Sequence, residues 1–151
     1  MTATCREACC SVTQRHTVSE LFERGFRRNR AAPLPIEGAQ LTDAEGNAAR
    51  FSIDIADGKI AGVGFRATSC ATLIAYCEFI AESVPGFRIE IARELTAANL
   101  VEALPGVPAL KRERAMLAIV AFRAALTTAS PLEQNGESRN EGRLHLRHPT
   151  P

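Results

Sequence analysis

The stretch FSIDIADGKIAGVGFRATSCATLIAYCEFIAE, residues 51–82, decides the fold of this chain. In its first part apolar and polar residues alternate, as in a strand with one buried face. The apolar residues of this alternation are Phe51, Ile53 and Ile55. The strand is expected to begin near Ala48, and Asp57-Gly58 supplies two residues that tolerate positive φ in a tight turn. The pattern therefore predicts an antiparallel hairpin.

The returning strand of this hairpin leads into a helix. It is predicted from Lys59 to about Ala67. Its residues expected on one face are Ala61, Val63, Phe65 and Ala67, and those on the other are Gly62 and Gly64. After Thr68-Ser69 the apolar period changes to 3.6, which indicates a helix that ends at Pro85-Gly86. Cys70 lies where this helix begins.

Two further elements are predicted upstream of the hairpin. Thr17 and Glu20 have the spacing of a capping box, which predicts a helix that ends near Arg28. The stretch Arg30–Gly38 contains two prolines and is expected to be an extended connection. Residues Gln40–Glu45 are a candidate third antiparallel strand.

Two more helices are predicted after Pro85-Gly86. Thr96 is the expected cap of a short helix that Pro105-Gly106 ends, and a largely buried last helix runs from about Ala109 to Leu126. The order of helix, strands and helices predicts an α+β fold, with a small antiparallel three-stranded sheet and helices packed on one face.

The expected domain lies between two polar ends. Residues 1–16 lack apolar periodicity and are interpreted as a flexible leader, residues 17–127 as the domain, and residues 128–151 as a disordered tail. The leader contains three thiols, Cys5, Cys9 and Cys10. Their spacing matches no standard zinc site, so we interpret them as incidental.

Composition narrows the classes of function. Lys and Arg total 18 against 17 Asp and Glu, so no overall charge draws the chain to nucleic acid or to an anionic membrane. No stretch approaches the roughly 20 apolar residues of a membrane span, and the start is too polar for a signal peptide. We therefore expect a cytoplasmic protein. In a reducing compartment, five cysteines favour metal, sulfur or redox chemistry over structural disulfides, and of these Cys77 is expected to pack in the core.

Four stretches together resemble the iron–sulfur cluster scaffold family typified by IscU and the N-terminal domain of NifU. They are Arg27–Leu34 (RRNRAAPL), Asp54–Phe65 (DIADGKIAGVGF), Phe65–Glu82 (FRATSCATLIAYCEFIAE) and Leu104–Leu126 (LPGVPALKRERAMLAIVAFRAAL). The last two are diagnostic, because they are similar to a corner where a cysteine opens a helix and to the Leu-Pro-Pro-Val-Lys segment before the last helix. The resemblance implies a scaffold or sulfur carrier rather than a turnover enzyme. Its implied partners are a cysteine desulfurase or other iron–sulfur assembly proteins.

Members of this family hold a nascent cluster or a metal ion with three cysteines and an aspartate. At the matching positions this chain has Glu45, Asn47, Cys70 and, for the family's His-Cys pair, Glu113-Arg114. Only Cys70 keeps its thiol. The resemblance implies iron or a transient iron–sulfur cluster as cargo, and Cys70, Glu45 and Glu113 as a reduced ligand set for iron or zinc.

A second hypothesis gives Cys70 a role in sulfur transfer. The N-terminus of a helix favours the nucleophilic thiolate, and Arg114 would strengthen this effect if it lies beside the thiol. SufE-type sulfur acceptors resemble the same fold and take up persulfide sulfur on one cysteine, so Cys70 is a candidate acceptor. Two alternatives stay open. Cys70 is a small apolar residue that closes the corner, or the chain is a non-catalytic binding protein of the assembly machinery.

Overall fold

The computed structural model describes residues 17–147, and the side chains of residues 17–130. The elements follow the order helix, strands, helices that the sequence predicts. Their bounds are α2 Val18–Arg28, β1 Ile36–Glu37, β2 Leu41–Thr42, β3 Ala48–Ala56, β4 Lys59–Ala67, α3 Ala71–Ser83, α4 Ile89–Ala92, α5 Ala97–Ala103, the 3-10 helix η1 Ala109–Lys111 and α6 Glu113–Arg147. The predicted α+β class is confirmed.

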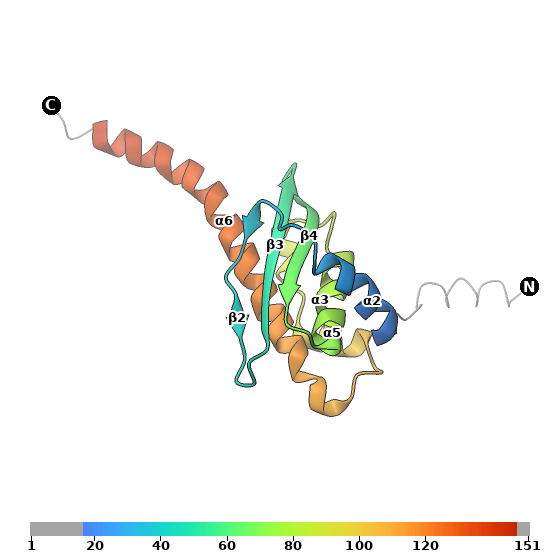
Figure 1. Ribbon diagram of the computed structural model, residues 1–151. Coiled ribbons are helices and arrows are strands. Elements are labelled where there is room, and N and C mark those ends of the chain that lie inside the picture. The colour runs from blue at the N-terminus through green and yellow to red at the C-terminus, as the bar shows by residue number, and fades with distance from the viewer. Residues whose placement is uncertain (1–16, 148–151) are drawn as a thin grey trace, which may run out of the picture.

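Strand β3 is the centre of the sheet. It pairs antiparallel with β4 along one edge and with the short strands β1 and β2 along the other (Figure 1). The β3–β4 turn has positive φ at both Asp57 (56°) and Gly58 (75°), as the sequence predicts. The predicted third strand is the two-residue β2, while β1 lies inside the stretch that was expected to be an extended connection. The structure thus has one more short strand than the sequence predicts.

The face of β4 differs from the prediction in its first half. The pairing with β3 shifts between Asp54 and Ile55, so that Ile55 pairs with Ile60 and Ala61 is left over. A bulge of this kind reverses the alternation on one side of it. As a result Ile60 is buried and Ala61 is exposed, whereas Val63 faces the core as expected.

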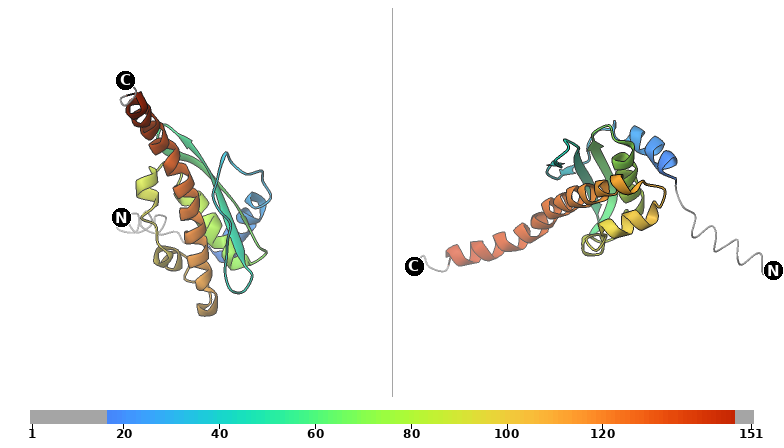
Figure 2. Two further views of the ribbon diagram at one scale, coloured as in Figure 1. Left: turned by 90° about the vertical axis from the view of Figure 1, so that its left-hand side faces the viewer. Right: turned by 90° about the horizontal axis from the view of Figure 1, so that it is seen from below.

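Helices α3 and α6 lie side by side on one face of the sheet, and α2 packs on α3 (Figures 1 and 2). The core lies between this helical layer and the sheet, where Phe51 contacts Phe65 and Phe122 at ring-centroid distances of 5.8 and 5.5 Å. Gly38 permits the close approach of the sheet edge to α6, because a Cβ at this position would lie 2.5 Å from the backbone nitrogen of Ala125.

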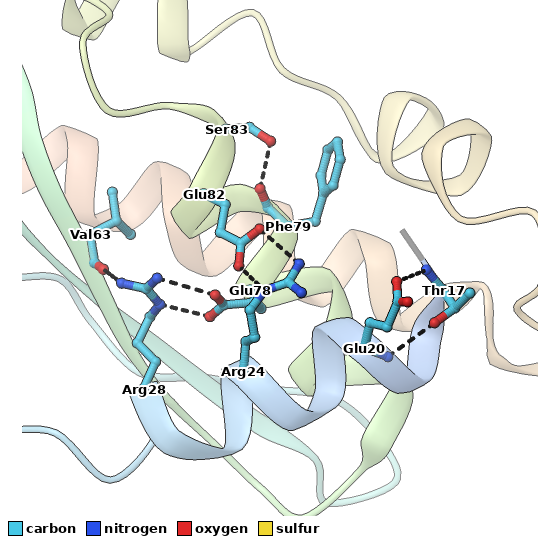
Figure 3. Close-up of polar contacts among 9 residues, drawn as sticks. All are labelled: Thr17, Glu20, Arg24, Arg28, Val63, Glu78, Phe79, Glu82 and Ser83. Carbon is cyan, nitrogen blue, oxygen red and sulfur yellow. Dashed lines mark hydrogen bonds and ion pairs between the residues drawn. The ribbon is translucent and has the colours of Figure 1, made fainter. Parts of the chain in front are cut away.

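Two ion pairs connect α2 to α3 (Figure 3). Arg24 Nε lies 2.6 Å from Glu82 Oε2 at the surface. Arg28 donates Nε and Nη2 to the carboxylate of Glu78 at 2.6 and 3.1 Å, and Nη1 to the carbonyl of Val63 in β4 at 3.0 Å. Glu78 is 1% exposed, so this pair joins two helices and the sheet at a buried point.

Two helical features differ from the prediction. Helix α4 forms in a stretch for which no element was expected. Helix α6 was expected to end near Leu126, but its backbone stays helical to Arg147. Its buried face extends through Ala129, and Arg93 donates to the hydroxyl of Ser130 at 2.6 Å, so tertiary contacts support the helix beyond the predicted end.

The division into leader, domain and tail at residues 16 and 127 remains a prediction. Among the helices of residues 17–147, none combines the length and the hydropathy that a membrane span requires.

Candidate functional site

The corner between β4 and α3 places Cys70 at the N-cap of the helix. Its φ of −121° and ψ of 115° are extended, its carbonyl accepts from the Ile74 N–H at 2.9 Å, and its own N–H donates to the Thr68 carbonyl at 2.7 Å. The side chain makes no capping hydrogen bond to the helix. The thiol is half-buried, so it is neither a core residue nor a fully solvated one.

The loop between β2 and β3 presents Glu45 to this corner, and Asp43 shapes that loop. Asp43 Oδ1 accepts from the backbone N–H groups of Glu45 and Asn47, both at 2.9 Å. Asp43 Oδ2 accepts from Asn47 Nδ2 at 3.2 Å, and Gly46 takes a φ of 89° to close the turn. Asp43 was not identified from the sequence, although an Asp three residues before a Gly-Asn pair is a recognisable turn pattern.

Arg114, the second residue of α6, joins these pieces. It is 6% exposed, and its Nη2 donates to Glu45 Oε1 at 2.7 Å, while Nη1 lies 3.9 Å from Asp43 Oδ2. A hydrogen bond to the Cys70 side chain is the largest cause that raises the pKa of Arg114, and the bond to Glu45 adds to it. Arg114 Nε is buried and has no hydrogen-bond partner in the described part of the chain.

Glu113 is exposed, and with Leu41, Asp43 and Met116 it lines a surface pocket that does not include Glu45 or Cys70. Within residues 17–130, no three or more His, Cys, Asp or Glu side chains gather into a group that could hold a metal ion. The structure brings Glu45, Cys70 and Arg114 together, but it does not assemble Cys70, Glu45 and Glu113 into the predicted ligand set.

The donor set at this corner does not fit a cluster. Cluster iron is held by thiolates, and within the described residues this corner offers one thiol, Cys70, together with the carboxylates of Asp43 and Glu45. Arg114 already donates to Glu45 Oε1 and interacts with the Cys70 side chain. Asn47, at the position of the family's aspartate, donates to Asp43 and so serves the loop.

The second described cysteine has no access to this site. Cys77 is fully buried in the core, where burial raises the pKa of its thiol far above the ordinary value. Cys77 therefore serves as a packing residue. The leader thiols Cys5, Cys9 and Cys10 lie outside the described residues.

Comparisons with known proteins place this fold. The structure matches a solved structure described as a nitrogen-fixing NifU-like protein (N-terminal) from Brucella abortus, with a TM-score of 0.54 and 16% identity over 76% of this chain and 92% of that one. A second solved structure, described as a hypothetical protein, gives a TM-score of 0.49 with 18% identity over 71% and 97%. No curated protein sequence matches the chain.

The sequence itself gives the family. The family model of the NifU-like N terminal domain matches residues 23–131, which run from the middle of α2 into α6, past the buried Ala129. The match includes both the corner at Cys70 and the start of α6 at Arg114. The chain belongs to the NifU-like N-terminal domain family, whose members have a scaffold-like role in iron–sulfur cluster assembly.

Proposed function

We propose that this chain serves iron–sulfur cluster assembly as a sulfur carrier, with Cys70 as the residue that accepts sulfane sulfur. The observation that carries the proposal is the position of Cys70, half-buried at the N-cap of α3 and with no capping hydrogen bond from its side chain. The interaction of Arg114 with this side chain supports it. A guanidinium beside the sulfur can donate hydrogen bonds to the negative charge that the sulfur carries when it attacks. The cluster-holding role of the family is not supported here, because one thiol is too few for cluster iron.

The proposed step is a persulfide transfer. The thiolate of Cys70 attacks the outer sulfur of a persulfide carried by a cysteine desulfurase. The bond between Cys70 and this sulfur forms as the sulfur–sulfur bond of the donor breaks, and the donor cysteine leaves as a thiolate. One persulfide replaces another, so no external oxidant or reductant enters the step.

The surroundings of Cys70 suit such a transfer. The thiol is half-buried, and the side chain of Glu45, which binds the same arginine, is 62% exposed. Because this end of the ion pair is in contact with solvent, Glu45 can leave Arg114 for water when a donor approaches. Arg114 stays in place because its backbone belongs to α6 and its side chain is only 8% exposed. It would then stabilise the negative charge of the bound persulfide.

Mass spectrometry tests this proposal on the full chain. The protein is incubated with a cysteine desulfurase and cysteine, alkylated and digested, and sulfane sulfur is located by peptide. We expect it on Cys70, absent in Cys70→Ser and retained in the matched control Cys77→Ser. Sulfane sulfur found only on Cys5, Cys9 or Cys10, or undiminished in Cys70→Ser, would overturn the proposal.

A further inference from the structure

Arg114 is the point at which three separate segments of the chain meet. Its guanidinium contacts Glu45 and Asp43 in the β2–β3 loop and Cys70 at the start of α3, and its backbone belongs to α6. In the sequence comparison made above, Glu45, Cys70 and Arg114 all stand at positions where members of the scaffold family have cysteine ligands. The side chains at two of these positions, Glu45 and Cys70, therefore meet the guanidinium carried by the third.

We infer that Arg114 is a tethered cation that replaces a bound metal ion at this corner, holding the β2–β3 loop, the start of α3 and the start of α6 together without metal. The inference does not depend on whether Cys70 carries sulfur. It concerns what occupies the centre of the site, whereas the proposed function concerns what Cys70 accepts.

Charge and geometry support the replacement. A guanidinium is planar, stays protonated and carries five N–H donors, so it can bind a carboxylate and a thiol at once. Asp43 and Glu45 bring negative charge to one side of it, as metal ligands would. A divalent cation entering the same space would be repelled by the fixed positive charge of Arg114 and would have to displace its bond to Glu45.

Within the described residues, Arg114 Nε is buried without a hydrogen-bond acceptor, so packing is a poor explanation for an arginine at this position. A buried donor without an acceptor is destabilising, and an apolar side chain at this position would avoid that cost. An arginine at the second position of α6 also opposes the helix dipole. The interactions of the guanidinium with Glu45 and Cys70 are what offset these two costs.

The test exchanges the tethered cation for thiol ligands. Glu45→Cys with Arg114→Cys would set two thiols beside Cys70, a ligand set that zinc and cobalt accept with water in the fourth position. Asn47 is left unchanged because its amide holds Asp43 in the loop. The full chain is used, with Cys5, Cys9 and Cys10 changed to serine in every sample and a phosphine reductant present.

We expect the double variant to bind one Co²⁺ with thiolate charge-transfer absorption, and its melting temperature to rise with Zn²⁺ and fall with a chelator. The parent with Arg114 and Glu45 intact should show neither response. The matched control, the double variant with Cys70→Ala, should lose most of the absorption. Stoichiometric Co²⁺ or Zn²⁺ binding by the parent that Cys70→Ala abolishes would overturn the inference, as would a folded double variant that binds no metal.

If the double variant does not fold, the single variant Arg114→Met decides the question. Hydrogen exchange is then compared with the parent in peptides that cover residues 43–47 and 68–72. Faster exchange in both segments, with the rest of the sheet unchanged, supports a clamp that joins them. Unchanged exchange in the two segments would show that Arg114 does not hold them, and the inference would fail.

Discussion

Replacing Arg28 with methionine tests the buried ion pair that holds α2, α3 and β4 together. Burial raises the pKa of Glu78 from its ordinary value of 4.5 to about 7, while the hydrogen bonds from Arg28 oppose this rise. A carboxyl whose pKa is raised on folding contributes stability that is fully present below pH 4.5. That contribution falls as the pH rises toward 7 and then levels off, because both states are then ionised.

The free energy of unfolding of Arg28→Met should continue to fall above pH 7, where the contribution of Glu78 in the parent no longer changes with pH. Without Arg28 the pKa of Glu78 rises beyond 7, and each pH unit between 7 and the new value costs about 1.4 kcal/mol. Over two pH units that is at most about 3 kcal/mol. The Arg28 side chain is 34% exposed, so solvent screening reduces this value. We expect the difference in free energy of unfolding between parent and variant to grow by roughly 1–2 kcal/mol from pH 7 to pH 9. At pH 5, where Glu78 is neutral in both proteins, the gap should be about 1–2 kcal/mol from lost hydrogen bonds.

Urea unfolding at pH 5, 7 and 9 measures this gap. Arg28→Met is compared with the parent, and both are compared again in the background Glu78→Gln, in which the gap should not depend on pH. Arg24→Met is a matched control, because the Arg24–Glu82 pair lies on the same two helices but is 38% and 26% exposed. It should cost under about 1 kcal/mol. A gap for Arg28→Met that stays constant or narrows from pH 5 to 9 would refute the reasoning.

Two further substitutions separate packing from chemistry. Gly38→Ala should lower the free energy of unfolding, measured by urea titration, by about 2 kcal/mol or more. The new Cβ would lie 2.5 Å from the backbone nitrogen of Ala125, so the sheet edge would have to move. A change under about 0.5 kcal/mol would contradict this contact. Arg114→Met should change the free energy of unfolding by under about 1 kcal/mol, because Glu45 is exposed enough to be hydrated in its absence. The same variant should slow the alkylation of Cys70 by iodoacetamide several-fold at pH 7. An unchanged rate would show that Arg114 does not influence the reactivity of the thiol.

The sequence predicts those elements whose signals are local. The capping box at Thr17, the helix cap at Thr96 and the turn at Asp57-Gly58 each depend on residues within four positions, and all three form as predicted. The features that differ are set by distant contacts. The exposed Ala61 follows from the pairing of β4 with β3, and α6 extends past Leu126 because Ala129 and Ser130 find partners across the fold.

The candidate site was predictable only in part, for the same reason. Cys70 at a helix start is a local signal, and its position is confirmed, although its role in sulfur transfer stays a prediction. The contact of Arg114 with Glu45 joins residues 69 positions apart in the chain, and no pattern within either segment specifies it. Position matching to the family suggested that Arg114 lies near Cys70. It gave no sign of Asp43, which matches no ligand position and acts through the loop.

The first segment that resembles the family, Arg27–Leu34, shows why the fold persists while the ligands change. The Asn29 side chain accepts from the N–H of Ala67 and donates to its carbonyl, at 2.8 and 3.0 Å, and Arg28 donates to the carbonyl of Val63. These side chains satisfy backbone groups along the edge of β4, so their loss would leave buried polar atoms without partners. Within the described residues, by contrast, the side chains of Glu45 and Arg114 bond to each other and not to backbone groups. At these two positions a thiol, a carboxylate or a guanidinium is compatible with the same backbone fold. Membership of this family therefore does not by itself decide whether the corner at Cys70 binds metal.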